Sequence, residues 1–309
     1  MTGLNNITLI IGNGYDLDLK LRSSFNDFAN SDEWKTLANF ANEKYVGKFE
    51  KFREYSLLLH LNNAKETSNW FNIEEEISAY IKENCYCPTI YVELVHSEFT
   101  LLKSKLKEYI KRISDTYVTN DKCIAYTLLN RLQAVECPVN IFSFNYTDCF
   151  QLCNILQNMQ KTSYTHMHKT IKDEDIVLGC RILPFMPSKK EFSFFYKFNM
   201  IDSANHLYKK LIESQEVIIF GHSLNMIDYC YFEDYFKWIS SANGMPVHLT
   251  FITLNKKTER EIRDNIGEET IIKMHYYLQS IDFIHTKSIY EGQKDDCTKW
   301  ENLLKRLSQ

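Results

Sequence analysis

The sequence predicts an α/β domain built on a mostly parallel, Rossmann-like sheet with helices on both faces. Two patterns carry this prediction. Short apolar runs typical of buried strands alternate with longer amphipathic segments in the second half of the chain, as expected for a parallel sheet covered on both sides. In addition, a long stretch after the first strand candidate has only helical periodicity, which predicts a large all-helical insertion.

The first strand is expected at residues 8–11, where an apolar run ends in a glycine turn. Later runs of the same kind predict strands at residues 138–144, 163–167, 175–179, 216–220 and 247–253. The amphipathic segments between them predict helices at residues 148–160, 202–213, 228–240 and 256–266. Beyond these, residues 256–309 carry no recognisable motif.

The insertion is expected at residues 25–134, where apolar residues recur three and four positions apart, as in 71–81 and 91–113. Residues 1–24 and 135–309 are then expected to form one Rossmann-like nucleotide-binding domain.

The composition excludes several classes of protein. Of the 309 residues, 44% are hydrophobic, which is too many for a disordered chain. The 36 Lys and Arg against 40 Asp and Glu give a net charge of −4, whereas nucleic-acid-binding proteins usually have a basic excess. No apolar run approaches the roughly 18 residues of a membrane span, and no signal peptide is recognisable. We therefore expect a cytoplasmic protein with neither a nucleic-acid nor a membrane partner.

The nine cysteines contain no C-x-x-C pair. Their closest spacings are Cys85 with Cys87 and Cys149 with Cys153, whereas a zinc ribbon needs four thiolates in two close pairs. Scattered buried thiols and no metal site are expected.

Candidate site residues follow the expected strands, because open parallel sheets bind ligands beyond the carboxyl ends of their strands. The first strand leads into Gly12, Asn13, Gly14 and Asp16, and such glycines let backbone N–H groups face a phosphate. Leu17 occupies the third glycine position of the dinucleotide fingerprint, so a plain tight turn is the alternative.

Asn145 follows the second strand and can hold a ribose hydroxyl, an amide ligand or a water, since its side chain both donates and accepts. Thr147 or Asp148 is expected to cap the next helix. Gly221, His222 and Ser223 end another strand at a place suited to a phosphate or ribose.

His166 and His168 lie two apart on an expected strand, so both imidazoles should share one face. No third ligand lies at a telling spacing, which makes a general base more plausible than a metal pair. A purely structural pair is the other alternative. Asn255, at the end of the last expected strand, stands where an adenosine ribose commonly binds.

These strand ends resemble the AbiH family of bacteriophage abortive infection proteins, and their layout is distantly similar to sirtuin-type NAD-consuming domains. The segments that carry the AbiH resemblance are 9–17 (LIIGNGYDL), 23–28 (SSFNDF), 69–74 (NWFNIE), 144–147 (FNYT) and 221–225 (GHSLN) with Asp228. The resemblance implies a sirtuin-like fold and NAD as the substrate. It also implies depletion of a central nucleotide during infection.

By this resemblance, Asn145 and His168 are the catalytic residues: Asn145 holds the nicotinamide-side ribose or the attacking water, and His168 is the base. The residues implied to border NAD are Gly12, Asn13, Gly14, Asp16, Thr147, Gly221, His222, Ser223 and Asn255. Lys169 follows His168 where both groups usually have glycine, so the choice between His166 and His168 stays open.

Two further departures limit the sirtuin comparison. Thr147 stands where sirtuins have an aspartate, with Asp148 one place later, and the zinc ribbon of deacetylases is missing. Deacetylation is therefore not expected, and the expected function is a phage-defence effector that hydrolyses NAD to nicotinamide and ADP-ribose. One alternative is a nucleotide-binding sensor that does not cleave its ligand and uses the insertion to form homo-oligomers or bind a defence partner. Another is a metal-dependent nuclease using His166 and His168.

Overall fold

The computed structural model describes residues 6–45, 47–67, 71–84, 88–180, 190–197, 200–241 and 247–308. The chain divides into two compact units. The sheet unit contains residues 1–21, 117–170 and 199–309, and the helical unit contains residues 22–116 and 171–198. Compared with the expected domain ranges, residues 117–134 group with the sheet, and residues 22–24 and 171–198 group with the inserted helices.

The sheet unit is built on six parallel strands in the order β3-β2-β1-β4-β5-β6. The strands are β1 (Ile7–Ile11), β2 (Val139–Ser143), β3 (Thr162–His166), β4 (Glu216–Phe220), β5 (His248–Thr253) and β6 (Ser280–His285). This is the order of a doubly wound Rossmann sheet, in which the direction of winding reverses between β1 and β4. The predicted fold class is confirmed.

Two strand predictions need correction. Residues 175–179 form no strand: Ile176 and Leu178 are buried in the helical unit, and the N–H of Gly179 donates to Oε1 of Glu74 at 3.3 Å. A short apolar run looks the same in a strand and in a buried loop. The sequence analysis also missed β6, an edge strand whose first three residues are only half-buried, so it lacks the continuous apolar run of the inner strands.

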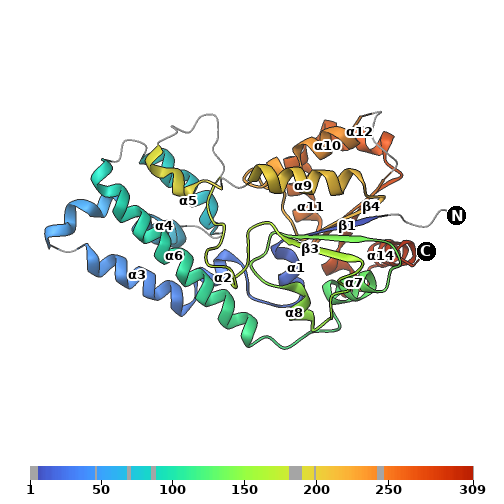
Figure 1. Cartoon of the computed structure of the whole chain (residues 1–309), viewed down its shortest axis with the longest axis horizontal. Coiled ribbons are helices and arrows are strands. Elements are labelled where there is room, and N and C mark those ends of the chain that lie inside the picture. The colour runs from blue at the N-terminus through green and yellow to red at the C-terminus, as the bar shows by residue number, and fades with distance from the viewer. Residues whose placement is uncertain are drawn as a thin grey trace. The chain divides into compact units, whose positions relative to one another are not determined.

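Helices cover both faces of this sheet (Figure 1). They are α1 (Asn13–Asp18), α7 (Ile124–Gln133), α8 (Cys149–Cys153), α9 (Met200–Ile212), η3 (Tyr229–Tyr231), α10 (Glu233–Ile239), α11 (Lys256–Ile266), α12 (Glu268–Tyr277), α13 (Thr286–Tyr290) and α14 (Lys294–Arg306). The helix expected at 148–160 ends early, because Asn154 turns into the left-handed region with φ of 50°. The helix expected at 228–240 is divided at Phe232 into η3 and α10.

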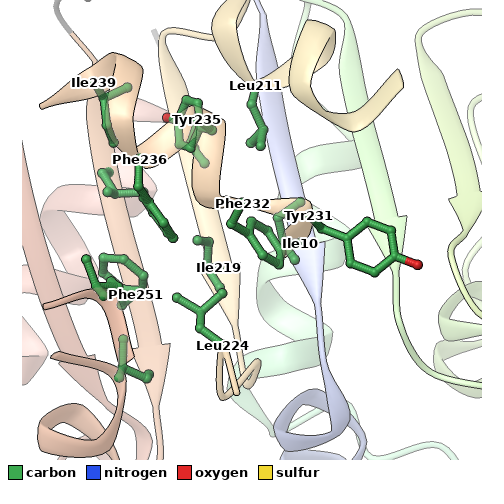
Figure 2. Packing of buried hydrophobic residues seen from close by; sticks show 14 of the residues in the cluster. Ile10, Leu211, Ile219, Leu224, Tyr231, Phe232, Tyr235, Phe236, Ile239 and Phe251 are labelled. Carbon is green, nitrogen blue, oxygen red and sulfur yellow. The ribbon is translucent and has the colours of Figure 1, made fainter. Parts of the chain in front are cut away.

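The core under α9 to α12 rests on one row of side chains that crosses the sheet in register. The row consists of Phe142, Ile10, Ile219, Phe251 and Phe283, one from each of five neighbouring strands. All five are buried and pack with side chains of the covering helices. Figure 2 shows Ile10, Ile219 and Phe251 of this row below Phe232 and Phe236. Each fully buried side chain of this size contributes about 1.5–3 kcal/mol.

The helical unit contains the insertion between β1 and β2. Its elements are α2 (Phe25–Ala29), α3 (Asp32–Lys44), η1 (Gly47–Tyr55), α4 (Leu57–Thr67), α5 (Ile73–Glu83), α6 (Thr89–Asp115) and η2 (Lys190–Phe195). The helices expected at 71–81 and 91–113 are therefore present as α5 and α6. Residues 171–198 also belong to this unit. A buried ion pair between Lys197 Nζ and Glu74 Oε1, at 2.8 Å, connects them to α5. No helix in the described ranges is long and apolar enough to span a membrane.

The cysteines of the described residues are free thiols, as expected. Cys149 and Cys153 are buried on α8, and burial raises the pKa of Cys153 to about 12. A thiol with so high a pKa stays protonated near neutral pH and is a poor nucleophile. Cys85 and Cys87 lie outside the described residues.

The loops after β1 and β4 pack backbone against backbone where the sheet reverses its winding. The N–H of Gly12 donates to the carbonyl of Phe220, and that of Gly14 to the carbonyl of Gly221, both at 2.9 Å. A Cβ added to Gly14 would lie 2.6 Å from Cα of Gly221. Glycine is therefore needed here because the two main chains meet without room for a side chain.

We predict that Gly221→Ala lowers the free energy of unfolding by about 2–5 kcal/mol, the sum of left-handed strain and overpacking. Its φ is 65°, and a Cβ would lie 2.4 Å from backbone atoms of Gly14 and Tyr15. Gly292 is the matched control, since it has a similar φ of 71° with no atom within 4 Å of an added Cβ. Gly292→Ala should cost only the strain, about 1–2 kcal/mol. Urea unfolding measures both, and equal losses would contradict the packing argument.

Candidate functional site

Asp16 joins the loops that follow β1 and β2. Its side chain is buried on α1, with 1% of its surface exposed. Oδ1 accepts a hydrogen bond from Nδ2 of Asn145 at 2.8 Å, and Oδ2 accepts one from Oγ1 of Thr147 at 2.7 Å. Nδ2 of Asn145 also donates to the carbonyl of Gly12 at 3.1 Å. Both amide hydrogens of Asn145 are thus engaged, so a ligand or water would bind its Oδ1.

A second group of polar side chains, the histidine cluster, consists of His168, His222 and Asp228. His168 follows β3, His222 follows β4, and Asp228 precedes η3. Each side chain is less than 10% exposed. Nε2 of His168 lies 3.4 Å from Oδ1 of Asp228, and Nε2 of His222 lies 3.9 Å from Oδ2. The buried carboxylate therefore stands between two imidazoles whose Nε2 atoms both face it.

Aromatic side chains enclose the histidine cluster. The ring of Phe144 meets both imidazoles edge to face, with centroids 5.3 Å from His168 and 4.4 Å from His222. Tyr231 and Phe232 pack against the same Phe144 ring. Apolar walls of this kind exclude water and strengthen the electrostatic interactions inside.

The proton of His222 can be assigned from its neighbour. Nδ1 of His222 accepts a hydrogen bond from the N–H of Leu224 at 3.0 Å, so the neutral ring carries its proton on Nε2. The N–H at Nε2 then faces Oδ2 of Asp228 at 3.9 Å, and this nitrogen does not have the lone pair that a metal ion requires. Within the described ranges, no three His, Cys, Asp or Glu side chains form a group suited to holding a metal.

His166 and His168 do not share one strand face. β3 ends at His166, so the two-residue periodicity of a strand does not extend to His168, and that premise was wrong. Nδ1 of His166 lies 3.4 Å from the carbonyl of Asn145, and its ring contacts Tyr164. His168 instead faces Asp228. The two imidazoles therefore have different surroundings.

The backbone conformation differs after the two histidines, and the choice of His168 as the base stays a prediction. Lys169 adopts φ of 60°, a left-handed conformation that glycine adopts most easily. The exposed lysine therefore occupies a position at which glycine would be less strained. Met167, which follows His166, is not among the residues with positive φ.

Several residues that were predicted to bind a nucleotide form hydrogen bonds with other parts of the protein. The N–H groups of Gly12 and Gly14 donate to carbonyls of the β4 loop, so the expectation that they point toward a phosphate is wrong. Asn255 caps α11 by accepting from the N–H groups of Lys257 and Thr258. Their contact with a nucleotide stays a prediction, as does that of Asn13, the first residue of α1.

Of the two expected helix caps, Asp148 caps α8, whereas Thr147 donates to Asp16. Ser223 is exposed beyond β4. The sequence analysis gave no role to Asp228. It appears in the resembling segments, but its place in an irregular turn has no periodicity that would link it to His168.

We predict that Asp16→Asn lowers the free energy of unfolding by about 1–3 kcal/mol, because one buried acceptor oxygen becomes a donor group facing a donor. Asp148→Asn is the matched control, since asparagine caps a helix as well as aspartate does, and it should change stability by less than about 0.5 kcal/mol. Chemical denaturation of both variants measures the difference. If Asp16→Asn left the free energy of unfolding unchanged, the assigned hydrogen bonds would be contradicted.

We also predict that Lys169→Gly leaves the protein more stable by up to about 1 kcal/mol, because the left-handed strain is relieved. Lys169→Ala removes the same side chain but keeps a Cβ, so it should bring no gain. The melting temperatures of the two variants separate the backbone effect from the loss of the lysine charge.

The amino-acid sequence matches a known protein family. A family model described as bacteriophage abortive infection AbiH matches residues 8–248, from β1 to the first residue of β5, and includes Asp16, Asn145 and the whole histidine cluster. A comparison with curated proteins found no match. Since the family model spans most of the sequence, the chain belongs to the AbiH family of bacteriophage abortive infection proteins.

Proposed function

We propose that this phage-defence protein hydrolyses NAD to nicotinamide and ADP-ribose. The observation that carries the proposal is the buried pair of His168 and Asp228 at the carboxyl edge of a doubly wound sheet, the edge where such sheets bind nucleotides. Asn145 directly follows Phe144, whose ring contacts the His168 imidazole.

The reaction needs little acid catalysis from the protein. The bond between C1′ of the ribose and the nicotinamide nitrogen breaks, its electron pair stays on that nitrogen, and a water oxygen forms the new bond to C1′. Nicotinamide leaves as a neutral molecule. The water has to lose a proton, and imidazole is suited to accept it near neutral pH. Asp228 beside His168 would stabilise the resulting imidazolium.

Asn145 is proposed to orient the ribose or the attacking water through Oδ1. Asp16 and the carbonyl of Gly12 hold its amide group in one orientation, so the acceptor oxygen is fixed before a ligand binds, which is favourable for positioning. In this proposal Asp16 and Thr147 support Asn145. Ser223, exposed beyond β4, is the residue proposed to meet a phosphate.

A nucleotide sensor that binds without cleaving is the second candidate, and the closed glycine turn favours it. Gly12 and Gly14 already donate to the β4 loop, so these amides would reach a pyrophosphate only after the two loops separate. A sensor could couple that separation to a partner protein or to a second copy of the chain.

We predict that the protein consumes NAD, and that His168→Gln and Asn145→Ala each slow turnover by about 10²–10⁴-fold, as expected when a base or a positioning group is lost. His275→Gln is the matched control, since His275 is an exposed histidine on α12, and it should keep the wild-type rate. Chromatography of the products from purified protein and from phage-infected cells measures turnover with and without the stimulus of infection.

Intact NAD in both settings would overturn the hydrolase proposal. In that case, a melting temperature raised by NAD or ADP-ribose would favour the sensor. Equal NAD loss with wild type and His168→Gln would instead remove His168 from the mechanism.

A further inference from the structure

In the reaction as written above, Asp228 acts only after His168 has taken up a proton, and His222 has no role, although both are buried beside the proposed base. We infer that Asp228, held by His222, is the positioning residue that fixes the proton of neutral His168 on Nε2 and so makes Nδ1 the nitrogen that accepts the proton of water. This inference rests on the proposed function for its catalytic part. Its account of the histidine cluster rests on geometry alone.

The first step concerns the carboxylate. Asp228 is 7% exposed, and an ionised carboxylate at such a depth needs donors around it. The N–H of Leu224 fixes the neutral His222 ring with its proton on Nε2, and that nitrogen faces Oδ2 of Asp228. His222 thus turns an N–H toward the carboxylate at 3.9 Å, from a ring whose tautomer its own backbone determines.

The second step concerns His168. Its Nε2 lies 3.4 Å from the other oxygen, Oδ1, a separation at which a charged acceptor favours a proton on the facing nitrogen. Contacts of this length between catalytic groups commonly tighten into hydrogen bonds when substrate binds. A neutral His168 with its proton on Nε2 has its lone pair on Nδ1. An aspartate that sets the tautomer of a catalytic histidine acts in this way in hydrolytic triads.

The third step concerns rigidity. Phe144 contacts both imidazoles, and Phe232 also packs against His222, so the rings are held between aromatic side chains. Rotation of either ring about its χ2 bond would move an N–H away from the carboxylate and into apolar surroundings, which costs free energy. The packing and the carboxylate therefore select the same ring orientation.

The test combines NMR with kinetics. Nitrogen-15 spectra of the imidazoles should show His168 with its proton on Nε2 in the wild type, and a mixture of tautomers in Asp228→Asn. We expect Asp228→Asn to lower kcat by at least about 100-fold with little change in KM. Asp296→Asn is the matched control, because Asp296 pairs with another buried imidazole, Nδ1 of His285, at 3.1 Å. It should leave kcat and the His168 spectrum unchanged.

Two substitutions of His222 test the donor to Asp228. Glutamine places an amide N–H where Nε2 was, whereas asparagine places a carbonyl where Nδ1 accepted from Leu224. His222→Gln keeps an N–H facing Asp228 and should be the more active variant, whereas His222→Asn should lose about 10-fold, the effect of one polar interaction with a carboxylate.

The inference is overturned if His168 carries its proton on Nδ1 in the wild type, or if Asp228→Asn leaves the tautomer unchanged. If the tautomers are as expected but wild type leaves NAD intact in infected cells, the proposed reaction fails while the account of the cluster stands. A loss of activity in Asp296→Asn equal to that in Asp228→Asn would also contradict a specific positioning role.

Discussion

The direct contact between the loops after β1 and β4 is the constraint on which the rest of the site depends. These strands are neighbours at the point where the sheet changes its direction of winding, so their loops leave the sheet side by side. Gly14 and Gly221 let the two main chains touch. One loop leads to Asp16 and the other to His222, and the contact therefore determines where both polar groups stand.

Buried acidic side chains organise the site on each side of that contact. Asp16 is nearly inaccessible and is satisfied by Asn145 and Thr147, while Asp228 stands between His168 and His222. A carboxylate removed from water is tolerated only where donors surround it, so each aspartate holds its neighbours in a defined orientation. The Asp16 group orders the amide of Asn145, and the Asp228 group orders imidazoles. Fixed orientation of both kinds is what a hydrolytic site would need before substrate arrives.

Predictions from local sequence succeeded where one residue type has one structural consequence. The inner strands were recognised from apolar runs, because a strand buried on both faces has few polar positions. Predictions from local sequence failed where the same pattern fits two structures. Residues 175–179 are apolar without being a strand, and the helix after Asp148 ends at Asn154 because one residue takes the left-handed conformation. The glycine turn was recognised, but its N–H groups bind the neighbouring loop and not an inward-facing phosphate.

The sequence by itself determined the fold class, the helical insertion, the family and the strand ends at which polar residues gather, because these follow from periodicity and from short segments of chain. Only the tertiary structure decided which polar residues meet. His168 and Asp228 are sixty residues apart in the numbering, and no periodic pattern links them. They come together because β3 and β4 lie in one sheet with β2 and β1 between them and because Tyr231 and Phe232, which follow Asp228, pack against Phe144. Contacts of this kind depend on how distant segments pack, which local sequence does not encode.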